Sequence, residues 1–175
     1  MRYVLFAGFG FLAVNLCGSV FGYATIAGLV PDLILILAIA IMFNEHSLMP
    51  IIFAAVFGFI YDDLFSPVLG GNALAYTVSI ILLYIALRKS ERIRFWMPAL
   101  AGFGCYIIKE LILAIIVFAL GRQFDLLYMM LRFILPGAGL TAGIMIPMYY
   151  LFKKLYTVSW IRPRRKYADD MEMEI

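Results

Sequence analysis

Long apolar segments recur along this chain and leave only short stretches for polar and charged residues. Six segments of 14 to 25 residues are mainly apolar: 3–23, 29–43, 48–61, 73–87, 96–120 and 134–152. Hydrophobic residues make up 65% of the chain and charged residues 14%, whereas soluble domains average roughly a half and a quarter. A globule of 175 residues cannot bury so much apolar surface. We therefore expect a bundle of helices in a lipid bilayer.

The six segments differ in length, and the length decides how each could cross a bilayer. A transmembrane helix needs about 20 mainly apolar residues, which the first, fifth and sixth segments supply. The three segments between them have only 14 or 15 residues, so they need neighbouring turn residues, a thinner bilayer or shielding by other helices. The sequence predicts an all-α polytopic membrane bundle at residues 1–156. We expect about six transmembrane helices, or five if the second and third segments form one re-entrant hairpin.

Basic residues are concentrated on one side of the predicted membrane domain. With the N-terminus inside, 11 of the 14 Lys and Arg residues face the cytoplasm. They are Arg2, Arg88, Lys89, Arg92, Arg94, Lys153, Lys154, Arg162, Arg164, Arg165 and Lys166. Because cytoplasmic loops are enriched in Lys and Arg, we predict a multi-pass protein of the bacterial inner membrane with both termini cytoplasmic. Residues 157–175 form its basic and acidic cytoplasmic tail, with the basic run against anionic lipid.

Several carboxylates lie at the ends of the predicted membrane helices. Asp32 follows Pro31 at a helix start, where proline gives up no hydrogen bond and a carboxylate favours the positive helix end. Gly58 is four residues before Asp62, hence on the same face, and permits close approach of another helix. Asp62 and Asp63 would point about 100° apart, so they cannot form one acid–base pair. A solvated pair and a specific contact both remain open for them.

The sequence "SPVLGGNAL" at 66–74 is typical of a turn between two helices. Pro67, Gly70 and Asn72 are turn formers, and Asn72 is a candidate N-cap for the helix that begins near Ala73. A turn and a cap explain these residues without a ligand.

Lys109 and Glu110 lie near the middle of the long segment 96–120. An ionisable residue at that depth costs several kcal/mol unless it is paired, and indicates a functional site by default. Neighbouring residues diverge on a helix, so we expect the two not to neutralise one another directly. At least one should meet a group on another helix, such as Asp32 or Asp62, or a partner subunit. Structural pairing, partner contact and ligand or proton handling remain the alternatives.

The chain carries no pattern typical of a catalytic or metal site. Cys17 and Cys105 lie in apolar segments away from other ligands, and the single histidine, His46, lies in a polar turn. Neither a G-x-S-x-G sequence nor a phosphate-binding loop is present. We expect no enzyme activity, no cofactor, no metal and no nucleic-acid partner.

Three stretches in the first half of the chain resemble the rod shape-determining protein MreD family of bacteria. They are "PDLILIL" at 31–37, "GFIYDDL" at 58–64 and "SPVLGGNALAY" at 66–76, in the family's order and with its short spacings. The overall length, the N-terminal helix and the basic C-terminal tail also fit. The positions that match the family pattern are Pro31, Asp32, Gly58, Asp62, Gly70, Asn72 and Ala73. Lys109 and Glu110 match no motif of the family.

The resemblance implies a non-catalytic scaffold of the cell-elongation machinery, which acts in rod cell shape and peptidoglycan synthesis. Proteins of that family act with the single-span protein MreC. They link MreB filaments, directly or indirectly, to the glycosyltransferase RodA and its class B penicillin-binding partner. The family's helical bundle is similar to the substrate-binding subunits of energy-coupling-factor transporters. The matching residues, with Asp63, Lys109 and Glu110, are then candidates for packing or partner contact.

Two other functions compete with the scaffold. A substrate-binding subunit of a vitamin-type transporter would need a polar cavity that faces outward. An ion or proton carrier could use Lys109 and Glu110, although the chain lacks the inverted repeats and broken helices usual in transporters.

Overall fold

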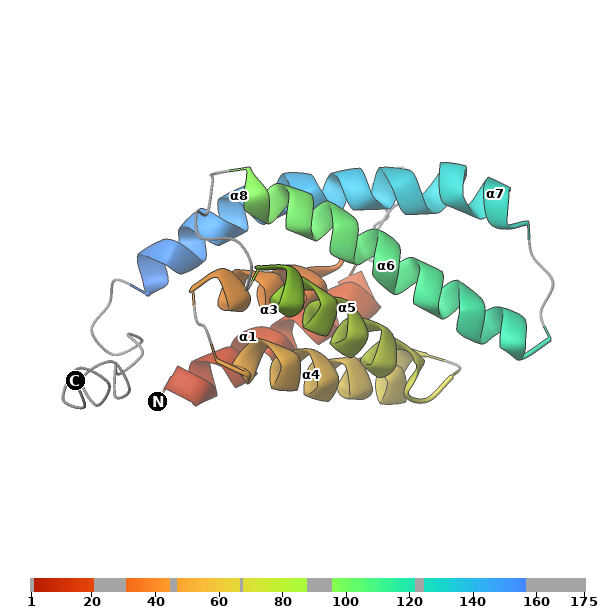
Figure 1. Cartoon of the computed structure of the whole chain (residues 1–175). Helices are drawn as coiled ribbons and strands as arrows, with labels where there is room; N and C mark the ends of the chain where they lie inside the picture. Colours follow the sequence, from red (N-terminus) through yellow and green to blue (C-terminus); the bar gives the residue numbers. More distant parts are fainter. Residues whose placement is uncertain are drawn as a thin grey trace, which may run out of the picture.

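The computed structural model describes residues 2–20, 31–44, 47–66, 68–87, 96–121 and 125–156, and they form only helices and turns. The helices are α1 (Arg2–Asn15), the π-helical η1 (Leu16–Val20), α3 (Leu33–Asn44), α4 (Met49–Phe65), α5 (Gly71–Leu87), α6 (Met97–Ala119), α7 (Leu126–Met129), the π-helical η2 (Met130–Ile134) and α8 (Leu135–Leu155). Because α1 continues into η1, and α7 through η2 into α8, the described residues form six helical rods (Figure 1). The all-α prediction is confirmed.

The helix bounds follow the apolar segments closely, with one clear exception. The α6 helix occupies Met97–Ala119, within the predicted 96–120. The last helix, in contrast, begins at Leu126 rather than near residue 134, because the apolar pattern continues upstream with Arg132 as its one charged residue. The predicted tail at 157–175, the basic cluster at 88–94, and the turn residues His46 and Pro67 lie outside the described residues.

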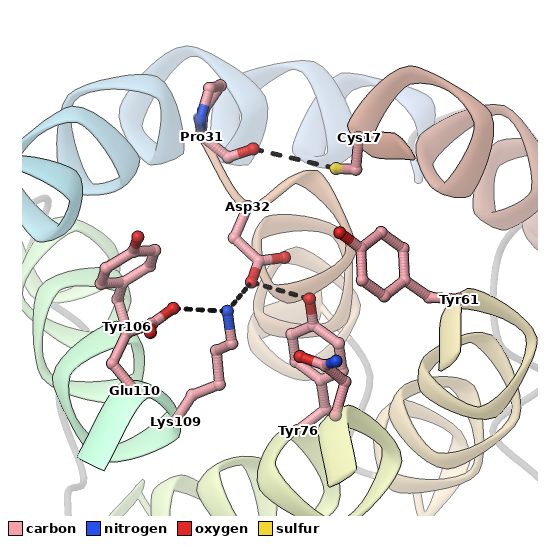
Figure 2. Close-up of a pocket in the computed structure, with 9 residues that line it drawn as sticks. Cys17, Pro31, Asp32, Tyr61, Tyr76, Tyr106, Lys109 and Glu110 are labelled. Atoms are coloured by element: carbon pink, nitrogen blue, oxygen red, sulfur yellow. Dashed lines mark hydrogen bonds and ion pairs between the residues drawn. The ribbon is translucent and has the colours of Figure 1, made fainter. Parts of the chain in front are cut away.

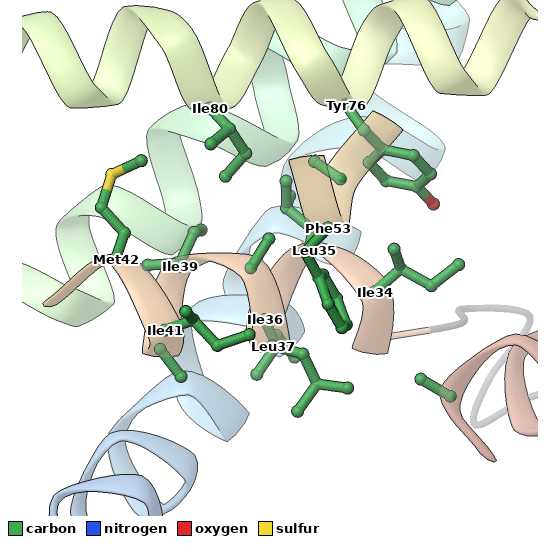
Figure 3. Close-up of a cluster of buried hydrophobic side chains, with 14 of the residues drawn as sticks. Ile34, Leu35, Ile36, Leu37, Ile39, Ile41, Met42, Phe53, Tyr76 and Ile80 are labelled. Atoms are coloured by element: carbon green, nitrogen blue, oxygen red, sulfur yellow. The ribbon is translucent and has the colours of Figure 1, made fainter. Parts of the chain in front are cut away.

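Helix α3 is the centre of the bundle and is buried on every side. All residues from Ile34 to Phe43 are buried. A helix that is apolar all round favours this position, because it has no polar face to turn toward water. In Figure 1, α3 lies between α1 and α4 on one side and α6 and α8 on the other, and all four pack against it. Figure 3 shows Ile80 of α5 and Phe53 of α4 directed at it.

Two described helices are long and apolar enough to cross a membrane. They are Met97–Ala119, with 23 residues, and Leu127–Leu155, with 29 residues. The apolar helices Val4–Ser19, Leu33–Asn44 and Gly71–Leu87 are shorter. Large apolar side chains are exposed on α1, α4, α5, α6 and α8, for example Val4, Phe59, Ile85, Ile115 and Leu151.

Two glycines allow sharp turns at one end of the bundle. Gly70, between α4 and α5, has φ of 81°, and Gly121, after α6, has φ of 80°. This left-handed conformation is strained for residues that carry a Cβ atom. Gly70 therefore lies in a turn, as the sequence predicts, and lets α5 return directly along α4.

Candidate functional site

Near the end of the bundle where α4 ends and α5 begins, five helices surround a small polar cavity (Figure 2). Its volume is about 150 Å³. Its lining residues come from η1, the start of α3, and helices α4, α5 and α6. They are Cys17, Pro31, Asp32, Tyr61, Asn72, Tyr76, Tyr106, Lys109 and Glu110. Five of the predicted site residues, Pro31, Asp32, Asn72, Lys109 and Glu110, therefore meet at one cavity.

Asp32 is the central acceptor of this site. Its Oδ2 is 3.0 Å from Lys109 Nζ and accepts a hydrogen bond of 2.8 Å from the Tyr76 hydroxyl. Its Oδ1 accepts a hydrogen bond of 3.1 Å from the Leu35 amide in the first turn of α3. Asp32 thus caps its own helix, and the positive helix end also favours its charge. The sequence correctly places Asp32 at a helix start, but the expected position of Pro31 inside the helix is wrong, because α3 begins at Leu33. The same side chain joins α3 to α5 and α6.

Lys109 lies between two carboxylates. Its Nζ donates a hydrogen bond of 2.7 Å to Glu110 Oε1, in addition to the ion pair with Asp32. The prediction that Lys109 or Glu110 pairs with a group on another helix is confirmed by the Asp32 contact. The prediction that Lys109 and Glu110 do not pair directly is wrong. Their Cβ atoms diverge, but the long lysine side chain bends back to the neighbouring carboxylate.

Two tyrosine rings complete the surroundings of the Lys109 ammonium. Its Nζ is 5.4 Å from the ring centroid of Tyr76 and 5.3 Å from that of Tyr106. Cations are attracted to aromatic faces at such distances, and the attraction is stronger where water is excluded. Lys109 and Asp32 are only 7% and 6% exposed. Both charges are therefore buried, paired and hydrogen-bonded, which is what a buried ion pair needs to be tolerated.

Asp62 forms a second polar contact that joins α4 to α5. It is fully buried; its Oδ1 accepts a hydrogen bond of 2.7 Å from Asn72 Nδ2, and its Oδ2 accepts one of 3.0 Å from the Ala73 amide. The predicted N-cap role of Asn72 is therefore wrong, because Asp62 of the preceding helix binds this helix start instead. Asp63 is exposed, so the two neighbouring carboxylates do point in different directions.

Gly58 allows α4 and α5 to approach closely beside this contact. A Cβ atom at Gly58 would lie 2.7 Å from Ala73 Cα and 2.9 Å from Tyr76 Cδ2. Because the nearest atom belongs to the backbone, a larger side chain would push the helices apart. The close approach also brings the α5 amide of Ala73 to Asp62 and directs Tyr76 toward Asp32.

The tyrosines and Cys17 were not identified from the sequence as parts of this site. Tyr76 and Tyr106 lie in apolar segments, where the sequence gives no reason to distinguish a tyrosine from other packing residues. A signal was present for Tyr106, which precedes Lys109 by three residues and thus shares its helix face. Gly137 of α8 provides space for it, since a Cβ atom there would lie 2.5 Å from the Tyr106 hydroxyl.

The contacts at this site join α3, α4, α5 and α6 to one another. Each charged side chain at the cavity is engaged by another group of the chain. Within the described ranges, no group of three or more His, Cys, Asp or Glu side chains could hold a metal ion. Comparison of the chain with protein-family models, with curated proteins and with solved structures finds no match.

Proposed function

We propose that this protein is a non-catalytic membrane scaffold of the bacterial cell-elongation machinery, of the MreD type. The observation that carries the proposal is that the three stretches with the family resemblance form one connected unit. The Asp32–Tyr76 hydrogen bond joins the first stretch to the third. Asp62 joins the second to the third through Asn72 and Ala73. The matching residues thus depend on one another, as expected for a motif that specifies one fold.

The apolar exterior supports a membrane bundle of six spans. Large apolar side chains face outward on five helices, and they would suit lipid tails as surroundings. The α3 helix is too short to span a bilayer alone, and the longer helices packed around it would shield its ends from lipid. In this arrangement the polar cavity lies in the outer half of the membrane, because α4 runs outward and α5 returns from the 66–70 turn. Both termini are then cytoplasmic, in agreement with the distribution of Lys and Arg.

The size of the cavity favours a scaffold over a transport-binding subunit. Sites for small organic ligands usually enclose about 300–1,000 Å³, whereas this cavity has about 150 Å³. Its Asp32, Lys109 and Glu110 side chains are also bound to one another. The same pairing disfavours an ion carrier, since a group that carries an ion must be free to release its partner.

The α8 helix offers a face on which a partner helix could pack. Gly139 and Gly143 are four residues apart, so they lie on the same face, and both are exposed. A Cβ atom at either position would meet nothing within 4 Å. Small residues with this spacing let transmembrane helices approach closely. We propose that a single-span partner of the MreC type packs here, with RodA-type and penicillin-binding synthases in the same assembly.

Depletion of the protein in its native bacterium, followed by microscopy and purification of a tagged copy, tests this function. We expect rods to become spheres and a single-span protein and cell-wall synthases to co-purify. Cells that keep their shape but require a nutrient would refute the scaffold and favour the transport subunit.

Two substitutions then test the proposed partner face. Gly139→Leu with Gly143→Leu should abolish co-purification and fail to restore rod shape, while the protein remains in the membrane. The control is Gly8→Leu on α1, also exposed with nothing within 4 Å, which should behave as wild type. Equal behaviour of the two would exclude this face of α8.

A further inference from the structure

The Lys109 ammonium lies among groups of the kind that bind free ammonium ligands. Two carboxylate oxygens, Asp32 Oδ2 and Glu110 Oε1, are 3.0 Å and 2.7 Å from its Nζ. The rings of Tyr76 and Tyr106 are 5.4 Å and 5.3 Å away at their centroids. Carboxylates give charge-assisted hydrogen bonds, and aromatic faces attract the cation. Both classes of contact act on the same nitrogen atom.

These groups also converge on a space, which distinguishes them from an ordinary ion pair in a packed core. Interiors of proteins are close-packed, with few voids larger than a water molecule. Here a partly open pocket of about 150 Å³ remains beside the Lys109 side chain. Asp32, Tyr76 and Glu110 come from three different helices and all point toward this space (Figure 2). The groups that hold the Lys109 ammonium therefore border unfilled space.

We propose that the groups around Lys109 Nζ form an ammonium-binding site at the edge of this pocket, and that its occupant is the chain's own Lys109 side chain. Because the occupant is covalently attached, it binds without the entropic cost of association, and the site stays filled without a solute. Its cation joins α3 to α6 through Asp32. The ligand class that the site would accept in place of Lys109 is a primary alkylammonium ion. This inference goes beyond the scaffold function and does not depend on it.

Replacement of Lys109 by a small residue, with a free amine supplied in solution, tests the proposal. Lys109→Ala removes three carbons and the ammonium group, which is the composition of n-propylammonium. We expect the purified variant in detergent to melt well below wild type. Addition of n-propylammonium chloride should recover at least half of the lost melting temperature, and the effect should saturate in the millimolar range. Ethylammonium should act more weakly, because it leaves part of the space unfilled.

Several controls separate binding from general effects of salt or solvent. Sodium chloride and n-propanol at the same concentrations should give no recovery, because each lacks part of the ammonium ligand. Wild type should not respond, because its Lys109 ammonium already pairs with both carboxylates. Lys153→Ala, at an exposed lysine near the end of α8, should not respond either. Recovery of Lys109→Ala by sodium chloride alone, or equal stabilisation of wild type by the amine, would overturn the proposal.

A second variant keeps the test decisive if Lys109→Ala does not fold. Lys109→Ala with Glu110→Gln leaves only the Asp32 carboxylate, which still accepts hydrogen bonds from the Leu35 amide and the Tyr76 hydroxyl. This double variant should also be stabilised by n-propylammonium. Addition of Asp32→Asn should abolish the effect, because no carboxylate then faces the amine. A folded double variant without a saturable amine response would refute the assignment.

Discussion

The buried charges near the end of the bundle where α5 begins allow a sharp prediction about stability. Lys109→Met keeps a long apolar side chain but removes the cation shared by Asp32 and Glu110. The buried Asp32 carboxylate and the partly buried Glu110 carboxylate then lack their positive partner. Removal of one member of a buried ion pair costs about 3–5 kcal/mol, because the other charge is left uncompensated. For a chain of 175 residues, this corresponds to a fall in melting temperature of about 6–20 °C.

The same argument predicts that the loss is reversible by further substitution. Adding Asp32→Asn and Glu110→Gln to Lys109→Met removes both orphaned charges while keeping similar shapes. Since the single variant loses stability through uncompensated buried charge, and Asn and Gln carry no charge, the triple variant should recover most of the lost stability. The assay is reversible unfolding in mixed micelles, followed by circular dichroism. A single variant within about 1 kcal/mol of wild type, or a triple variant less stable than the single one, would refute the reasoning.

Three smaller perturbations can be measured in the same unfolding assay. Tyr76→Phe removes a hydrogen bond to a buried carboxylate and should cost about 1.5–3 kcal/mol; no change would mean that this bond is not formed. Asp62→Ala leaves the Ala73 backbone amide and the Asn72 side-chain amide without their acceptor, and should cost about 1.5–3 kcal/mol of unfolding free energy. Asp63→Ala, at an exposed site, should change it by no more than about 0.5 kcal/mol. Equal effects at the two carboxylates would contradict the burial of only one. Gly58→Ala forces α4 and α5 apart and should cost about 1–3 kcal/mol, whereas Gly139→Ala should be neutral or slightly stabilising; the opposite order would contradict the close approach at position 58.

The helices were predictable because the length and apolar composition of each segment indicate a helix without knowledge of the rest of the fold. Segment 96–120 is long enough to cross a bilayer, and α6 fills it almost entirely. The start of the last helix could not be predicted in the same way. Arg132 and Asp125 made the upstream residues look like a loop, yet η2 places the arginine on an exposed surface and the helix continues.

The site was predictable in its charged members but not in its geometry. The sequence offered Asp32, Asp62 or a partner subunit as the group that pairs with Lys109 or Glu110, because a buried charge needs an opposite one, and the structure selects Asp32. The direct bond between Lys109 and Glu110 was missed because the direction of the Cβ atoms does not fix the position of Nζ at the end of a flexible lysine side chain. The contact of Asp62 with the start of α5 was missed for another reason. Local sequence offers Asn72 as the cap, and only the close packing at Gly58 makes the carboxylate from α4 the better acceptor.

The complete burial of α3 has a consequence for how such a chain is made. In a bilayer, α3 would leave the ribosome before α6 and α8, which later cover one side of it. Its 12 residues extend only about 18 Å. Every face of the helix is compatible with hydrocarbon, so it can remain in contact with lipid tails until the later helices are inserted. Asp32, at the start of the helix, lacks its ion-pair partner during this time, because Lys109 is synthesised 77 residues later (109 − 32 = 77). In a bilayer, the final placement of α3 would therefore be a late step of biogenesis, completed when Lys109 is inserted and pairs with Asp32.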